Sequence, residues 1–154
     1  MKTSYQKILS FTNSASKFDA MNRATEGYET TKLDYALSKM LERLKSMGTK
    51  YLQKRADVEL EYALEDPKTG AVLFEEIIRD DQQIRLYKYS KEGLKKKDIA
   101  VQELFEEVRE FDIEPHYATT VPADLHDALI EVFKGFAIDP SYEKPVKKEV
   151  TTEE

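Results

Sequence analysis

The chain has 154 residues and no cysteine, and 24 basic against 30 acidic side chains give it a formal net charge of −6. Without cysteine there is no disulfide framework, no thiolate nucleophile and no cysteine-based zinc site. The basic and acidic side chains are interspersed along the chain, so we interpret the charged residues as a solvated surface. We therefore do not expect nucleic acid as a partner. No apolar run approaches the roughly 18 residues of a membrane span, so we expect no membrane partner.

The first element in chain order is a polar segment over residues 1–30. It is rich in serine, threonine and asparagine, and its apolar residues follow only a broken helical spacing. We expect one or two short helices here, lying on the core.

Residues 31–55 predict a long amphipathic helix. Its apolar side chains recur at steps of three and four, close to a heptad seam, at Leu33, Leu37, Met40, Leu44, Met47 and Tyr51. Two interpretations stay open: the seam covers the protein's own sheet, or it also pairs with another copy. We take these six residues as candidate partner-binding residues, together with Tyr87 and Tyr89, which lie where a half-exposed ring can anchor an interface.

Residues 57–89 predict a three-stranded antiparallel meander. The apolar residues from Val58 to Leu64 alternate with glutamates, which favours a strand, although they could also extend the preceding helix. The turn sequence at 66–70 leads into an apolar segment at 71–74, and a polar run at 79–83 separates this part from the last strand, 84–89. Such a sheet needs a helix on its apolar face, and we expect the long helix to supply it.

Two further helices complete the prediction. Ser90 can cap one helix, and Pro122 suits the first position of another, with a short extended segment over 112–118 between them. Residues 139–154 are charged and poor in apolar side chains, so we expect a flexible tail. The predicted protein is therefore helix-rich α+β, with a polar segment over 1–30, a single domain over 31–138 and a tail over 139–154.

The residues that carry chemistry are few. His116 and His126 are the only histidines, and neither belongs to an HxxxH or HExxH pattern. The carboxylates between Glu103 and Glu114 lack the spacing of a calcium loop, and the glycines form no nucleotide-binding pattern. We therefore assign no catalytic, cofactor-binding or metal-binding residue, expect no cofactor and no small-molecule substrate, and predict that the protein is not an enzyme.

Six short stretches follow one another along residues 32–138: Lys32–Leu37, Leu44, Leu64–Gly70, Tyr87–Tyr89, Glu103–Glu107 and Ile113–Glu114. In these residues and their order the chain resembles a group of small uncharacterised proteins encoded by tailed bacteriophages, with a departure at the charged insert 109–111. The resemblance implies a phage origin and supplies no activity and no site residue.

From the long helix, the tyrosines and this resemblance we expect a non-enzymatic phage structural or assembly protein. It would act through protein–protein contacts or self-association, in the virion or the cytoplasm of the host cell. The alternative is an intracellular acidic inhibitor of a host enzyme or defence complex, whose acidic surface would engage a basic nucleic-acid site.

Overall fold

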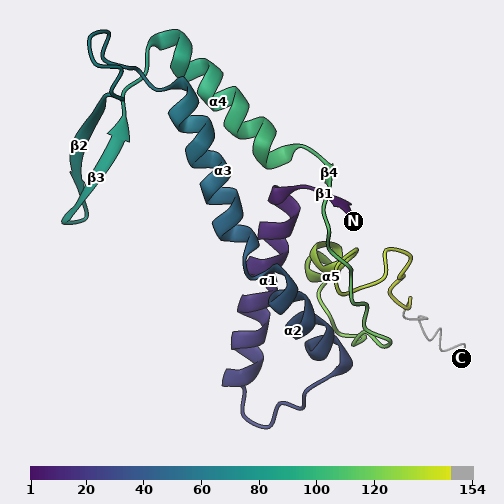
Figure 1. The fold of residues 1–154 in the computed structure, drawn as a ribbon. Coiled ribbons are helices and arrows are strands. Elements are labelled where there is room, and N and C mark those ends of the chain that lie inside the picture. Colours follow the sequence, from purple (N-terminus) through teal and green to yellow (C-terminus); the bar gives the residue numbers. More distant parts are fainter. Residues whose placement is uncertain (147–154) are drawn as a thin grey trace, which may run out of the picture. The chain divides into compact units, whose positions relative to one another are not determined.

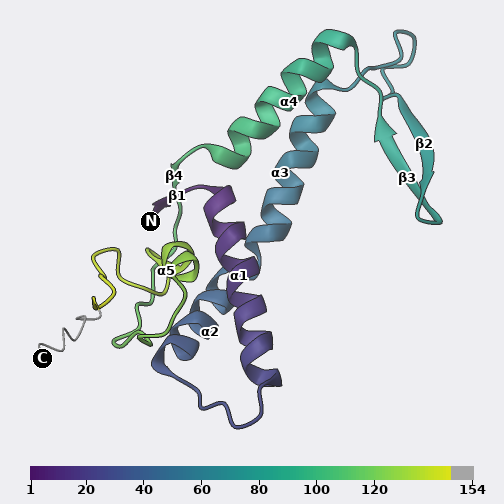
Figure 2. The same ribbon diagram turned by 180° about the vertical axis from the view of Figure 1, so that it is seen from behind.

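The computed structural model describes residues 1–146 and confirms a helix-rich α+β protein (Figures 1 and 2). In chain order, its elements are β1 (Lys2–Thr3), α1 (Tyr5–Ala24), α2 (Lys32–Leu44), α3 (Met47–Tyr62), β2 (Phe74–Arg79), β3 (Gln82–Tyr87), α4 (Lys91–Glu106), β4 (Arg109–Glu110) and α5 (Asp127–Phe133). The predicted tail falls partly outside the described residues, which end at 146.

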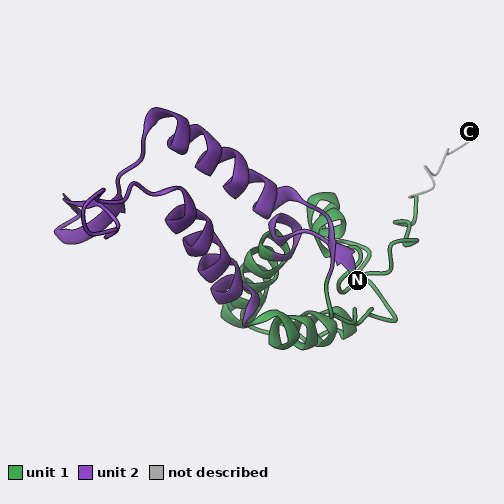
Figure 3. Cartoon of the chain, turned by 45° about the horizontal axis from the view of Figure 1, so that its top comes forward, with its two compact units in different colours: residues 1, 9–45, 111–154 green, residues 2–8, 46–110 purple. Residues whose placement is uncertain are grey.

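The chain divides into two compact units (Figure 3). Unit 1 comprises residue 1, residues 9–45 and the chain from residue 111 onward, and unit 2 comprises residues 2–8 and 46–110. The boundaries predicted at 30/31 and 138/139 do not coincide with these divisions. The sequence pattern misses the division because both units are assembled from segments that are far apart in the chain.

The polar N-terminal segment forms one long helix, α1, instead of one or two short ones. Ile8, Phe11 and Ala15 are buried at helical spacing on a narrow face, between polar residues that break the pattern in the sequence. Burial of this face outweighs the weak helix propensity of the serine, threonine and asparagine residues around it.

The predicted long helix is divided into α2 and α3 by a turn at Lys45 and Ser46. α3 then continues to Tyr62, so the strand predicted over 58–64 is wrong. Val58 and Tyr62 are four residues apart and both half-buried, whereas Leu60, between them, is 46% exposed. Burial thus follows the helical period rather than the period of two that the alternating glutamates indicate.

The predicted three-stranded meander is a two-stranded hairpin, β2 paired antiparallel with β3, plus an isolated bridge between Glu65 and Val72. Asp80 and Asp81 close the hairpin with φ angles of 52° and 60°, the left-handed geometry of a type I′ turn, which aspartate tolerates better than most residues. The earlier turn at 66–70 forms as predicted, with the amide of Gly70 donating to the carbonyl of Asp66 at 2.8 Å.

α3 packs on α4 instead of on the sheet, as both Figure 1 and Figure 2 show. Their contact includes a ring pair between Tyr51 and Phe105, with centroids 5.5 Å apart. At the other end, the hydroxyl of Tyr89 donates to the carbonyl of Glu59 at 3.2 Å. Gly93 lets the two backbones approach, because a Cβ there would lie 3.1 Å from the carbonyl oxygen of Tyr62.

Gly93→Val is expected to lower the free energy of unfolding of unit 2 by about 1–3 kcal/mol, because the added side chain forces α4 away from the backbone of α3. The matched control is Lys96→Val, at an exposed position of the same helix, which should cost only about 0.5 kcal/mol in helix propensity. Urea denaturation of both variants measures the difference. Equal losses in the two variants would contradict a close approach at Gly93.

The core of unit 1 contains an aromatic cluster. Phe11 stacks on Phe136 with centroids 4.6 Å apart and meets Phe133 edge to face at 5.8 Å. The final helix begins at Asp127, five residues later than predicted, with His126 as its N-cap. The segment predicted as extended runs beside the end of the cluster, where the amide of His116 donates to the carbonyl of Phe136 at 3.0 Å.

Candidate functional site

Six of the eight candidate partner-binding residues lie in the interior. The exposed fraction of each is 7% or less, for Leu33, Leu37, Met40, Leu44, Met47 and Tyr51. These side chains are therefore core residues, the first four in unit 1 and the last two in unit 2, and they offer no surface to a partner. Tyr89 is half-buried and holds α3 through Glu59, while Tyr87, 36% exposed at the end of β3, is available for contact.

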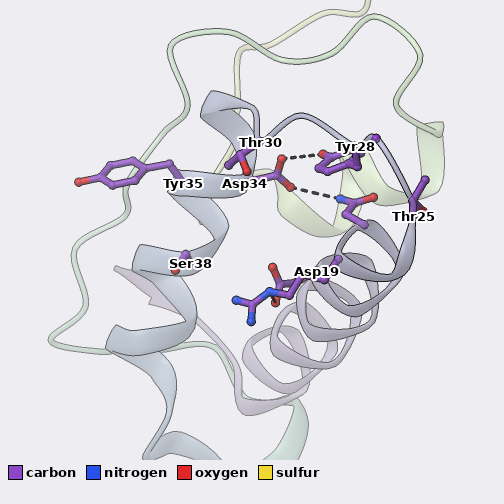
Figure 4. A pocket seen from close by; sticks show the side chains of 10 residues that line it. Asp19, Thr25, Tyr28, Thr30, Asp34, Tyr35 and Ser38 are labelled. Atoms are coloured by element: carbon purple, nitrogen blue, oxygen red, sulfur yellow. Dashed lines mark hydrogen bonds and ion pairs between the residues drawn. The ribbon is translucent and has the colours of Figure 1, made fainter.

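A cavity of about 370 Å³ opens within unit 1 between the end of α1 and the start of α2 (Figure 4). Asp34 is its central acidic group and accepts hydrogen bonds from the Tyr28 hydroxyl at 2.6 Å and the Asn22 amide at 3.2 Å. The same carboxylate accepts from the amide and the hydroxyl of Thr31, and the Asp34 amide donates back to that hydroxyl. This reciprocal pair is a capping box that begins α2.

The hydrogen bonds determine the ionisation of this cluster. Burial raises the pKa of Asp34, but the hydrogen bonds from Tyr28, Thr31 and Asn22 outweigh it and hold the pKa below its ordinary value. Burial, followed by the hydrogen bond to Asp34 and the charge of Asp34, raises the pKa of Tyr28 to about 12. Asp34 is therefore a fixed carboxylate with several donors already bound, suited to holding the loop 25–31 rather than to accepting a proton from a substrate.

Asp34→Asn is expected to lower the free energy of unfolding by about 0.5–2 kcal/mol at neutral pH, because it removes the negative charge and one of the two oxygens that accept hydrogen bonds at the start of α2. Because the folded pKa of Asp34 is depressed, its contribution is present above the unfolded pKa of about 3.9 and is lost as the pH falls through the folded value. The difference in free energy of unfolding between wild type and variant, measured by urea denaturation, should therefore shrink progressively as the pH falls below about 4. Asp19→Asn on the same cavity is the control, since its exposed ion pair with Arg23 should contribute at most about 1 kcal/mol.

The two histidines have structural roles. The Nδ1 atom of His126 accepts from the amide of Ala128 at 3.1 Å and caps α5, while the ring of His116 packs edge to face on Tyr35 at 5.6 Å. Within residues 1–146, no group of three or more histidine, aspartate or glutamate side chains could hold a metal ion. No helix in that range is long and apolar enough to cross a membrane.

Exposed large apolar side chains are more numerous on unit 2 than on unit 1. Of the sixteen large hydrophobic residues that are exposed between residues 1 and 146, eleven lie from Leu52 to Val108. We call these eleven the unit 2 apolar surface: Leu52, Leu60, Leu64, Leu73, Phe74, Ile78, Leu86, Tyr87, Leu94, Ile99 and Val108. Where neighbouring members of this set lie side by side, they form exposed apolar patches, and such patches are typical of a protein interface.

Sequence reasoning missed most of this surface because it assigned these residues to a sheet covered by a helix. One signal was present in the sequence. Both strands carry adjacent apolar residues, Ile77–Ile78 in β2 and Leu86–Tyr87 in β3, so that each face of the hairpin is partly apolar. A hairpin with two apolar faces cannot bury both against a single covering helix.

The chain matches no protein-family model, and no curated protein or solved structure is significantly similar to it.

Proposed function

We propose that this protein is a non-enzymatic structural or assembly protein that acts by binding other proteins through the unit 2 apolar surface. The observation that supports this proposal is the concentration of eleven exposed large hydrophobic side chains between Leu52 and Val108. Burial of apolar area stabilises association by roughly 25 cal/mol per Å², before the costs of ordering are subtracted. A partner that covers this surface therefore gains from contacts that the isolated chain leaves in water.

The surface has two parts with different geometry. On α3, Leu52 and Leu60 are eight residues apart, roughly 12 Å along the helix and 80° around it, so both lie on the same side of its exposed surface. The hairpin presents extended backbone together with Phe74, Ile78 and Tyr87. A helical face and a strand edge are two recurrent ways of binding a protein partner.

Because the chain resembles small proteins of tailed bacteriophages, we propose that it acts in a phage particle or in particle assembly within the host cytoplasm. In such particles, many copies of a chain meet in fixed geometry, which suits a protein that presents both a helical face and a strand edge.

The second candidate, an acidic inhibitor of a host protein, is favoured by one observation. Glu103, Glu106 and Glu107 line a hollow at the end of α4, where the helix dipole is negative. Glu107 pairs with Arg109 at 3.0 Å, whereas the carboxylates of Glu103 and Glu106 are each unfavourable there by about 0.3–1 kcal/mol unless a basic partner compensates them. A basic nucleic-acid site on a host protein would supply that compensation.

The test is quantitative mass spectrometry of purified phage particles from a host that expresses the tagged full chain. The wild type should be present at a fixed ratio to the major capsid protein after a salt wash. Leu52→Glu/Leu60→Glu should lower that ratio at least about tenfold, because it places two charges in the proposed contact. Met21→Glu is the matched control, since Met21 is 69% exposed but lies on α1 in unit 1.

Absence of the wild type from particles, with abundant chain in infected cells, would contradict the structural proposal and favour the inhibitor. An equal ratio for wild type and double variant would show that the particle binds another part of the chain. Circular dichroism of each variant verifies that the helices remain folded.

A further inference from the structure

The hairpin of β2 and β3 is a sheet with two open edges. Among residues 1–146, neither strand pairs with a third strand along its outer side. An isolated two-stranded hairpin is marginally stable in water, and an open edge favours pairing with another chain. The hairpin can therefore accept a third strand from another chain.

The ladder shows which backbone groups of β2 are available. In a hairpin closed by a two-residue turn, the flanking residues Arg79 and Gln82 form a hydrogen-bonded pair, and such pairs alternate along the strands. The amide of Lys88 donates to the carbonyl of Leu73 at 3.0 Å, in agreement with this alternation. Alternate residues of β2 therefore direct their amide and carbonyl groups away from β3: Phe74, Glu76 and Ile78.

The loop that precedes β2 leaves this outer edge open. Leu73 uses both backbone groups on the β3 side, since its amide donates to the carbonyl of Leu64 at 2.8 Å while its carbonyl accepts from Lys88. The segment around Leu64 consequently lies on the same side as β3. The outer edge of β2 remains accessible over the whole strand.

One antiparallel register of β2 with a second β2 is complementary in charge. When the two strands are centred on Ile77, Glu75 of each copy lies opposite Arg79 of the other, and Ile77 faces its own counterpart. In the same register, Glu76 and Ile78 pair through the outward backbone groups. Glu75, Ile77 and Arg79 then form non-hydrogen-bonded pairs, in which opposed side chains are closest.

The neighbouring registers bring like charges together. Because only outward-directed residues can form the hydrogen-bonded pairs, the next allowed centres are Glu76 and Ile78. Centring on Glu76 places this carboxylate opposite its own copy. Centring on Ile78 places Glu76 opposite Asp80 of the second chain and Glu75 opposite Asp81. Like charges directly opposite one another destabilise a ladder, so the charges select the register centred on Ile77.

We infer that a second copy of this chain binds the outer edge of β2, antiparallel and centred on Ile77, to form a four-stranded sheet in the order β3, β2, β2, β3. This inference rests on the proposed function, because it treats the hairpin as a contact surface. It identifies a second copy of the chain as the partner of the hairpin. Residues on one face of this sheet continue the existing contact between Ile77 and Ile84 into an apolar stripe across all four strands.

The outer edge of β3 is less suited to the same pairing. Arg85 is the only charged residue within β3, so self-pairing of that strand gains no ion pair inside the ladder. Arg85 is also engaged within its own hairpin, where its guanidinium lies 4.4 Å from the ring centre of Phe74 and pairs with Glu76 at 3.4 Å. The self-complementary pattern therefore belongs to β2.

Cysteine cross-linking tests the register in a chain that has no cysteine of its own. In the inferred sheet, the two copies of residue 77 have Cα atoms about 4.5 Å apart, within the range of a disulfide. The matched control, residue 84, is separated from its copy by three strand spacings, roughly 14 Å. Under mild oxidation, Ile77→Cys should form a covalent dimer at least about tenfold faster than Ile84→Cys. Equal rates would overturn the inferred pairing.

A charge exchange tests the complementarity by sedimentation velocity of the full chain. Glu75→Arg and Arg79→Glu should each weaken self-association about tenfold, because each creates two like-charged pairs. The double variant Glu75→Arg/Arg79→Glu should restore the wild-type dissociation constant within about threefold, which a merely misfolded hairpin would not do. A wild type that stays monomeric at high concentration, or a double variant as weak as the singles, would refute the inference. Loss of particle binding in Leu52→Glu/Leu60→Glu tests the proposed function separately.

Discussion

Phe11→Ala is expected to lower the free energy of unfolding of unit 1 by about 3–5 kcal/mol. The side chain of Phe11 has no exposed surface, and its ring contacts both Phe133 and Phe136. Truncation leaves a cavity between α1 and the C-terminal part of unit 1, where Phe136 loses its stacked ring and Phe133 keeps only its edge contact with Phe18. Such a loss is a large fraction of the free energy of unfolding of a typical domain, which is about 5–15 kcal/mol.

Hydrogen exchange with mass spectrometry, combined with urea denaturation, measures this prediction. Protection should fall most in α1 and α5, which the Phe11 ring joins, and should change little in the hairpin. Phe74→Ala is the matched control, because Phe74 is 41% exposed and its loss should cost less than about 1 kcal/mol. A small effect of Phe11→Ala, comparable to that of Phe74→Ala, would contradict the aromatic core.

The periodic seam of α2 and α3 was the most predictable part of the chain. Leu33, Leu37, Met40 and Leu44 recur at helical spacing, and the structure buries all four on α2. The pattern predicts the helix and its buried face. It does not predict what covers that face, because periodicity reports the local geometry of a segment and carries no information on its tertiary partner.

Unit 2 shows why the rest could not be derived. Residues 58–64 satisfy both a period of two and a helical period, and tertiary contact with α4 decides between them. The apolar residues of 57–89 were interpreted as one face of a sheet buried under the long helix. That interpretation made Phe74 and Ile78 parts of a covered sheet, whereas both are exposed. The candidate surface was therefore missed at residues that, in our proposal, are buried by a partner and not by the chain itself.

Leu37→Ala and Leu52→Ala should separate the core from the contact surface. Leu37 is 2% exposed, so its truncation should lower the free energy of unfolding by about 2–5 kcal/mol. Leu52 is 61% exposed and lies in a helix, where alanine is at least as favourable, so its truncation should change stability by less than about 0.5 kcal/mol. Urea denaturation of the two variants compares the same chemical change at a buried and an exposed position.

The binding behaviour of the same two variants should follow the opposite order. Measured at a temperature where both are folded, Leu37→Ala should bind the particle as the wild type does, because its side chain contacts only the interior. Leu52→Ala should weaken that binding, since it removes apolar area from the proposed interface, by up to about tenfold for one truncated leucine. If Leu37→Ala weakened binding while Leu52→Ala did not, the seam itself would be the contact surface, and the burial of α2 in the isolated chain would have to be undone on assembly.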